Sequence, residues 1–264
     1  MKKIVCVLLA SALFLSVLVQ GCSGKTGGYT YKNIPSDLPV KPSLLSEGEL
    51  QTKTEDYDAE KFPLVASVPE DDMWFYDINM AGKYGVLIKH AKTIYYYNWE
   101  YFRRSSFPEV YSYDYDGDGH KELAVSLKVD DGALNYQENL YIVDFDDPSF
   151  TIYSSGTLEA QAGACVTVEK DGKTGRYYLV DDNSKKKFEL DFTGMKGDLI
   201  GTTLDYVQNF TLGEKITGMA DIGFLFGNEG EPMFQNFAAE VDVEYADQTC
   251  NGVNARIVRG SGKK

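Results

Sequence analysis

The sequence predicts an all-β fold, and three observations support this expectation. The chain holds 19 Tyr and 14 Phe, and aromatic side chains favour strands. Its 25 Gly suit the tight turns that join short strands. From about Phe62 onward, no run of 10–12 residues has the apolar spacing that is typical of a helix. We therefore expect the folded part of the chain to be built of strands.

The N-terminus predicts an exported protein. Lys2 and Lys3 precede an almost wholly apolar stretch, Ile4 to Val19, which is too short and too close to the start for a comfortable membrane span. The segment from Val19 through Gly21 to Cys22 resembles a bacterial lipobox, which implies a signal peptide over residues 1–21 and a lipid on Cys22. An ordinary secretory signal with an incidental cysteine is the alternative.

Residues 22–60 are expected to form a flexible linker after the lipidated Cys22. Pro35, Pro39 and Pro42 interrupt regular structure, and small and charged residues fill most of the rest. As a flexible coil, a segment of this length spans roughly 35 Å. The remaining residues, 61–264, are expected to form an all-β domain, with a weak sub-boundary near residues 198–203.

The strands are expected where β-branched and aromatic residues lie between turn signals. Two hairpins stand out, one across His90 to Lys92 and one across the Asp171-Gly172 pair, which is typical of a tight primed turn. In chain order, the expected strands are 73–78, 84–89, 93–99, 109–113, 122–129, 139–145, 150–153, 166–169, 176–180, 188–192, 202–207, 216–226, 237–245 and 254–258.

Charge and cysteine content limit the classes of partner. Removing residues 1–21 takes away Lys2 and Lys3, so the formal charge falls from −14 to −16. Such a surface repels phosphate backbones, and we expect no nucleic-acid partner. Setting aside the signal and lipid positions leaves Cys165 and Cys250. An exported protein can pair them, although a buried, free Cys165 is the favoured interpretation.

The segment Asp114-Tyr-Asp-Gly-Asp-Gly-His-Lys-Glu122 predicts a calcium loop. Calcium takes six to eight oxygen ligands, and alternating Asp residues in a tight loop can surround one ion. Gly119 permits the sharp turn that brings the next backbone carbonyl inward. The expected ligands are the side chains of Asp114, Asp116, Asp118 and Glu122 and the carbonyl of His120.

The loop is not an EF-hand, because its twelfth position is Val125 and strands are expected on both sides. It is similar to the calcium loop of FG-GAP and VCBS-type repeats, which are found in uncharacterised Gram-positive lipoproteins among other proteins. This resemblance implies Ca²⁺ as cofactor and a propeller-like, partial or small, antiparallel sheet assembly. Because one copy of the loop is present, a β-sandwich is the alternative. Calcium in such a loop is expected to be structural.

Three aromatic residues, Tyr95, Tyr97 and Trp99, share one face of their expected strand. Exposed rings of this kind can stack on sugars, so they are a candidate ligand surface; buried rings pack in a sheet core, which is the favoured interpretation. His90 is expected to be exposed in its turn.

These observations favour a cell-surface lipoprotein on the extracytoplasmic face of the membrane, which acts as a non-catalytic, calcium-stabilised binding or adhesion-like module. Its expected partners are the membrane, through the lipid on Cys22, and a carbohydrate or protein ligand. One alternative is a polysaccharide-acting hydrolase, which needs two carboxyl groups facing one cleft at about 5–9.5 Å. The other is a purely structural envelope lipoprotein.

Overall fold

The computed structural model describes residues 26–27, 29–30, 64–77, 85–91, 93–99, 101–102, 107–132, 135–146, 149–227 and 231–259. The predicted signal peptide, Cys22 and most of the predicted linker lie outside these ranges. Within the described residues, no helix is long and apolar enough to cross a bilayer.

The first sheet is a four-stranded antiparallel meander. Its strands follow one another in space as they do in the chain, and β2 (Tyr29–Thr30) extends the edge beside β6. A short 3₁₀ helix, η3 (Pro69–Asp71), connects the first two strands. The strands are β3 (Leu64–Val68), β4 (Met73–Asp77), β5 (Val86–His90) and β6 (Thr93–Tyr97). The expected hairpin across His90 is present as the β5–β6 pair.

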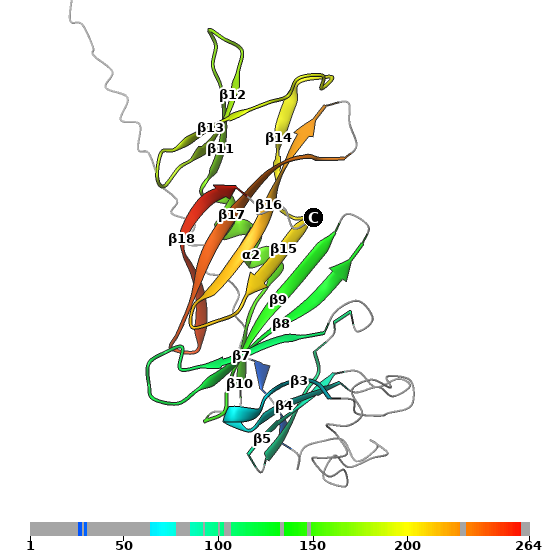
Figure 1. Ribbon diagram of the computed structural model, residues 1–264, viewed down its shortest axis with the longest axis vertical. Coiled ribbons are helices and arrows are strands. Elements are labelled where there is room, and N and C mark those ends of the chain that lie inside the picture. Colours follow the sequence, from blue (N-terminus) through cyan, green and yellow to red (C-terminus); the bar gives the residue numbers. More distant parts are fainter. Residues whose placement is uncertain are drawn as a thin grey trace, which may run out of the picture.

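A second antiparallel meander lies at the centre of the molecule (Figure 1). Here β1 (Thr26–Gly27) extends the edge beside the last strand. Residues 26–27 and 29–30 therefore take part in two different sheets, which differs from the flexible linker expected for them. The start of the third strand pairs in parallel with β15 further along the chain. The four strands are β7 (Glu109–Tyr113), β8 (Glu122–Asp131), β9 (Tyr136–Asp144) and β10 (Ser149–Tyr153).

The C-terminal strands continue this central sheet into one of ten strands. A separate three-stranded sheet, β11–β13, lies at the end of the molecule remote from β4 and β5 (Figure 1). The three strands are β11 (Val166–Lys170), β12 (Tyr177–Asp181) and β13 (Lys187–Leu190). The added strands of the large sheet are β14 (Leu199–Thr203), β15 (Val207–Thr211), β16 (Ile216–Phe226), β17 (Met233–Ala246) and β18 (Thr249–Arg259).

β8 and the second half of β9 are buried on both faces, because their side chains alternate between two cores. In β8, Leu123 and Val125 pack against the first sheet, whereas Ala124 joins the core formed with the C-terminal strands. In β9, Tyr141 likewise packs against the first sheet, whereas Ile142 joins the core formed with the C-terminal strands. This arrangement explains why each strand contains an uninterrupted apolar run, residues 123–125 in β8 and residues 140–143 in β9, rather than an alternating pattern.

One helix, α2 (Ser155–Gly163), interrupts the strands, and at 9 residues it is shorter than the 10–12-residue runs in which the sequence shows no helical spacing. The Ser154 side chain accepts a hydrogen bond from the Thr157 N–H at 3.2 Å and caps the first turn. Only Leu158 and Ala162 of the helix are buried, which is too few to give a helical pattern in the sequence. The helix packs closely because Gly218 and Gly252 leave room for Leu158 and Gln161.

Two local predictions differ from the structure. The expected strand 202–207 is divided between β14 and β15. β14 pairs with β16, whereas β15 pairs with both β16 and β9. β14 spans the weak boundary expected near residues 198–203. The turn after β11 is longer than a primed turn: the Asp171 N–H bonds to the Arg176 carbonyl at 2.8 Å, and the positive φ falls on Gly175.

The all-β class is confirmed for the described residues, with α2 as the exception. The sheets among these residues are antiparallel apart from the β9–β15 contact, and none of them closes on itself. The choice between a propeller-like assembly and a sandwich stays a prediction.

Candidate metal centre

The predicted calcium loop joins β7 to β8, and the two strands pair up to the loop, with Tyr113 opposite Glu122. The loop needs glycine at two points because Gly117 has φ +77° and Gly119 has φ +95°, values that other residues rarely adopt. The expected flanking strands are therefore present, and an EF-hand, which needs helices, is excluded.

Aspartate side chains fold the loop back on itself. Asp114 accepts hydrogen bonds from the N–H groups of Gly117 (2.8 Å) and Gly119 (3.1 Å) through its two carboxylate oxygens. Asp116 Oδ1 accepts from the Asp118 N–H at 3.1 Å, and Asp118 Oδ1 accepts from the His120 N–H at 2.7 Å. These bonds set the loop conformation.

Three of the predicted ligands converge. One carboxylate oxygen from each of Asp114, Asp116 and Glu122 lies within 4.8 Å of the other two, and this is the group with metal-binding geometry among the described residues. Hard oxygen ligands of this kind suit calcium or magnesium. Asp118 lies outside this group and is exposed, as is His120.

Glu122 is the buried member of the group, with 1% of its surface exposed. Burial raises the pKa of Glu122 to about 7; the hydrogen bond from the Tyr115 N–H opposes this, and the charges of Asp116, Asp118 and Asp144 raise the pKa further. The folded protein therefore resists ionisation of the Glu122 carboxyl group. A cation between the carboxylates would remove that resistance.

The loop also connects distant parts of the chain. Lys121 Nζ lies 2.7 Å from Asp71 Oδ1 in η3, and the Tyr115 hydroxyl donates to the Gly213 carbonyl at 2.9 Å in the β15–β16 turn. His120 Nδ1 lies 3.0 Å from Asp146 Oδ2 after β9. Sequence reasoning missed these contacts because the Lys121 and Tyr115 partners are 50 and 98 residues away.

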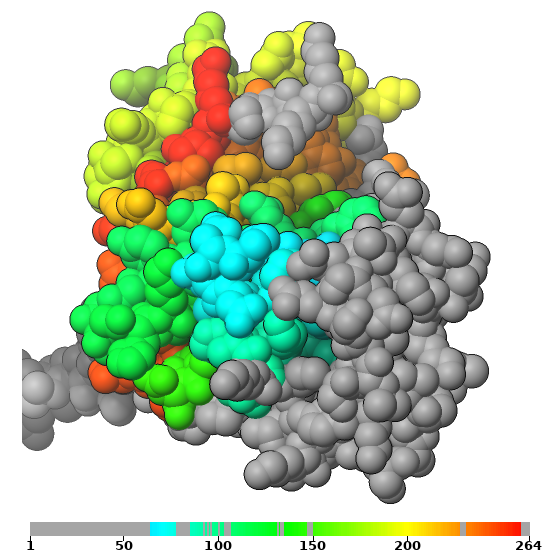
Figure 2. Space-filling view, turned by 60° about the horizontal axis from the view of Figure 1, so that its bottom comes forward, coloured from blue at the N-terminus to red at the C-terminus, as the bar shows by residue number. Residues whose placement is uncertain are grey.

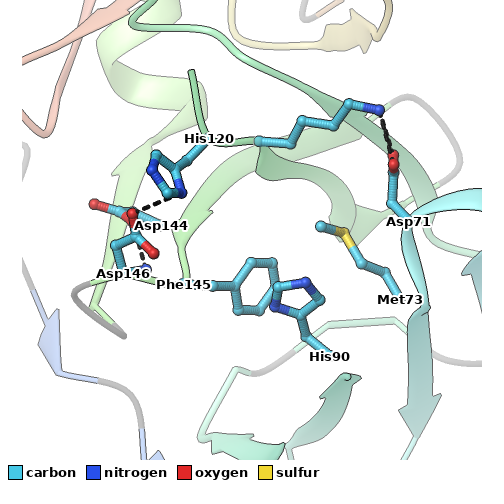
Figure 3. A pocket seen from close by; sticks show the side chains of 8 residues that line it. Asp71, Met73, His90, His120, Asp144, Phe145 and Asp146 are labelled. Atoms are coloured by element: carbon cyan, nitrogen blue, oxygen red, sulfur yellow. Dashed lines mark hydrogen bonds and ion pairs between the residues drawn. The ribbon is translucent and has the colours of Figure 1, made fainter. Parts of the chain in front are cut away.

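A cavity of about 220 Å³ adjoins the loop at its junction with the first sheet. Figure 3 shows side chains from η3, β4, β5, the loop and the end of β9 around it, and Figure 2 shows residues 64–77 (cyan) against the green residues of the central meander at this end of the molecule. Its lining residues are Asp71, Met73, His90, His120, Lys121, Asp144, Phe145 and Asp146.

His90 is not simply exposed in its turn, as expected, but half-buried in this cavity. Its ring centroid lies 4.3 Å from that of Phe145. Burial lowers the pKa of His90, and the charges of Asp72, Asp71 and Asp146 oppose the shift. Both histidines of the chain thus line one cavity, which no spacing in the sequence indicates.

Tyr95, Tyr97 and Trp99 are buried, with exposed fractions of 7%, 1% and 3%. Trp99 stacks on Tyr97 at 4.7 Å and on Tyr141 of β9 at 4.3 Å between ring centroids. Their shared face points toward the central meander, so these rings form core and offer no exposed surface for a sugar.

Cys165 and Cys250 are both buried and free. Burial raises the pKa of the Cys165 thiol to about 11 and that of Cys250 to about 12, so neither is a reactive thiolate at neutral pH.

Cys22 lies outside the described residues. Comparison of the chain with known protein families, curated proteins and solved structures gives no match.

Proposed function

We propose that this protein is a lipid-anchored module on the extracytoplasmic face of a bacterial membrane, in which one calcium ion stabilises a non-catalytic binding surface. The observation that carries the proposal is the converging triad of Asp114, Asp116 and Glu122 in a loop whose hydrogen bonds already hold it in shape. A preformed oxygen site costs little to organise when the ion binds.

The contacts of the loop favour a structural role for the ion. Lys121 bonds to η3 of the first sheet, and Tyr115 bonds to the turn before β16. An ion that fixes the loop would fix both contacts. Its binding energy would then stabilise the junction with the first sheet through Lys121 and the contact between two turns of the ten-stranded sheet through Tyr115. Because extracellular calcium modules bind at about 0.1–1 mM, this site would fill only after export.

The order of the strands supports the resemblance to propeller repeats. β3–β6 and β7–β10 are two successive four-stranded antiparallel meanders, the topology of a propeller blade. The predicted loop lies between the first two strands of the second meander. We propose that the two meanders are blade-like units.

Calorimetric titration of residues 23–264 with calcium tests the proposal. We expect one saturable site with a dissociation constant of about 0.1–1 mM. Asp116→Asn should weaken binding, because the amide oxygen brings no negative charge to the ion, while it can still accept the hydrogen bond from the Asp118 N–H.

Asp191→Asn is the matched control. Asp191 Oδ1 accepts from the Thr193 N–H at 2.9 Å, two residues on, so the change removes one charge from the same kind of turn elsewhere. The control should bind calcium as the unaltered chain does. Equal binding by Asp116→Asn, or no binding by the unaltered chain, would reject the metal site.

A further inference from the structure

Two short strands that closely follow the predicted lipid site are part of the fold. β1 pairs with β10 through Thr26 and Gly27, and β2 pairs with β6 through Tyr29 and Thr30. Figure 1 shows these blue strands between the first sheet and the central meander. Residues 26–27 and 29–30 therefore belong to the folded body of the protein rather than to a linker that precedes it.

The long segment after β2 connects two strands of one sheet. β2 forms one edge of the first sheet and β3 forms the other. Residues 31–63 join these two edges, so both ends of this segment are held by the same sheet. Its length therefore adds nothing to the distance between Cys22 and the sheets.

Only residues 23–25 separate Cys22 from β1. Four residue steps, from Cys22 to Thr26, extend at most about 14 Å. A flexible linker over residues 22–60 would instead span roughly 35 Å. Because a lipid on Cys22 would be embedded in the bilayer, Thr26 would lie within about 14 Å of the bilayer surface.

β10 and the β17–β18 turn form the surface beside β1. The Thr151 hydroxyl of β10 donates to the Gln248 carbonyl at 2.7 Å, which joins the strand to the turn. Ala246 and Asp247 are exposed at this turn. The β11–β13 sheet lies at the other end of the molecule (Figure 1). An anchor beside β1 therefore brings one end of the protein to the bilayer and holds the other end away from it.

We propose that the surface formed by β1, β10 and the β17–β18 turn rests on the head groups of the lipid bilayer. Residues 31–63 then connect the two edges of the first sheet and do not act as a tether. This inference rests on the proposed function through the lipid on Cys22, and it deepens that function by naming the surface that meets the membrane.

The test measures energy transfer from a dye on the full lipidated chain to acceptor-labelled lipids in phosphatidylcholine vesicles. Ala246→Cys places the dye beside the proposed surface, and Lys173→Cys places it in the β11–β12 turn at the other end; both positions are exposed. Cys165 and Cys250 are buried and should take up no dye. We expect strong transfer from residue 246 and weaker transfer from residue 173.

Two matched insertions distinguish a short tether from a long one. A Gly-Ser segment of about twelve residues spans roughly 20 Å. Inserted after Gly24, it should lower the transfer from residue 246, because it lengthens the only path between the lipid and β1. Inserted after Ser43, it should leave the transfer unchanged, because both ends of residues 31–63 are fixed. A cooperative thermal melt of each variant shows that it is folded.

Three results would overturn the inference while the lipid anchor stands: equal losses of transfer from the two insertions, no loss from the insertion after Gly24, or equal transfer from residues 173 and 246. In each of these cases the chain still floats with the vesicles. A chain that does not float with them would reject the lipid on Cys22, and with it both the proposed membrane anchor and this inference.

Discussion

Replacing Glu122 by glutamine should change the stability of the protein in opposite directions with and without calcium. In the metal-free protein, burial places the pKa of Glu122 at about 7, against an ordinary value of 4.5. The folded state therefore holds a proton that the unfolded state has lost between about pH 4.5 and 7. Stability falls as pH rises through this window, and the loss is complete above it.

The size of the effect follows from the pKa shift. At about 1.4 kcal/mol per pKa unit, the ionised Glu122 costs the metal-free protein about 3 kcal/mol at alkaline pH. Glu122→Gln removes the charge, and its amide oxygen can still accept the hydrogen bond from the Tyr115 N–H. The melting temperature in chelator should rise by about 6–12 °C, at 2–4 °C per kcal/mol for a domain of this size.

Calorimetric melts at alkaline pH, one set with chelator and one with calcium, measure the change in melting temperature in each condition. Calcium should raise the melting temperature of the unaltered chain and leave that of Glu122→Gln unchanged, because a ligand has been lost. Glu244→Gln, at an exposed position on β17, is the control and should change neither value. A lower melting temperature of Glu122→Gln in chelator would refute the reasoning, and an undiminished calcium effect would remove Glu122 from the ligand set.

Three further predictions concern other parts of the chain. Gly252→Ala should destabilise the protein by about 1–3 kcal/mol in urea unfolding, because its Cβ would overlap the side chains that pack beside it, while Gly172→Ala, with nothing within 4 Å, should be neutral. Burial alone would raise the pKa of Asp181, but hydrogen bonds from backbone N–H groups, including that of Ile257, outweigh it, so the net pKa lies below the ordinary value of 3.8. The stability of the protein should therefore fall as the pH drops through that lowered pKa. Asp181→Asn should lose this acid dependence and cost about 1–3 kcal/mol at neutral pH, because its amide turns a donor toward buried donors. Cys22→Ser should move the full chain from the detergent phase to the aqueous phase in a cloud-point partition.

The sequence predicted the features that depend on neighbouring residues. The His90 hairpin and the strands around the calcium loop follow from turn residues and strand-forming runs. The convergence of Asp114, Asp116 and Glu122 follows from their spacing in one loop. Asp118 has an equally regular position, but its carboxylate bonds to the His120 N–H and lies outside the converging group.

Features that depend on distant residues were beyond sequence reasoning. The cavity exists because Asp71, His90 and Asp146 come from three separate segments, and each is an ordinary polar residue in its own segment. The helix α2 is short and buries two side chains, so tertiary packing decides its conformation. Gly218 and Gly252 within strands were the available signal, since such glycines often mark a close approach of another element.

The central meander also sets an order for folding. Its hairpins close short loops, as where Tyr113 meets Glu122, whereas Gln208 must find Gln137 across 71 residues to join β15 to β9. Short closures cost less entropy, so β7–β10 should form early and present both of its apolar faces to the segments that follow. The calcium loop closes the first of these hairpins. Calcium should therefore speed refolding rather than only slow unfolding, because it stabilises contacts already made at the transition state.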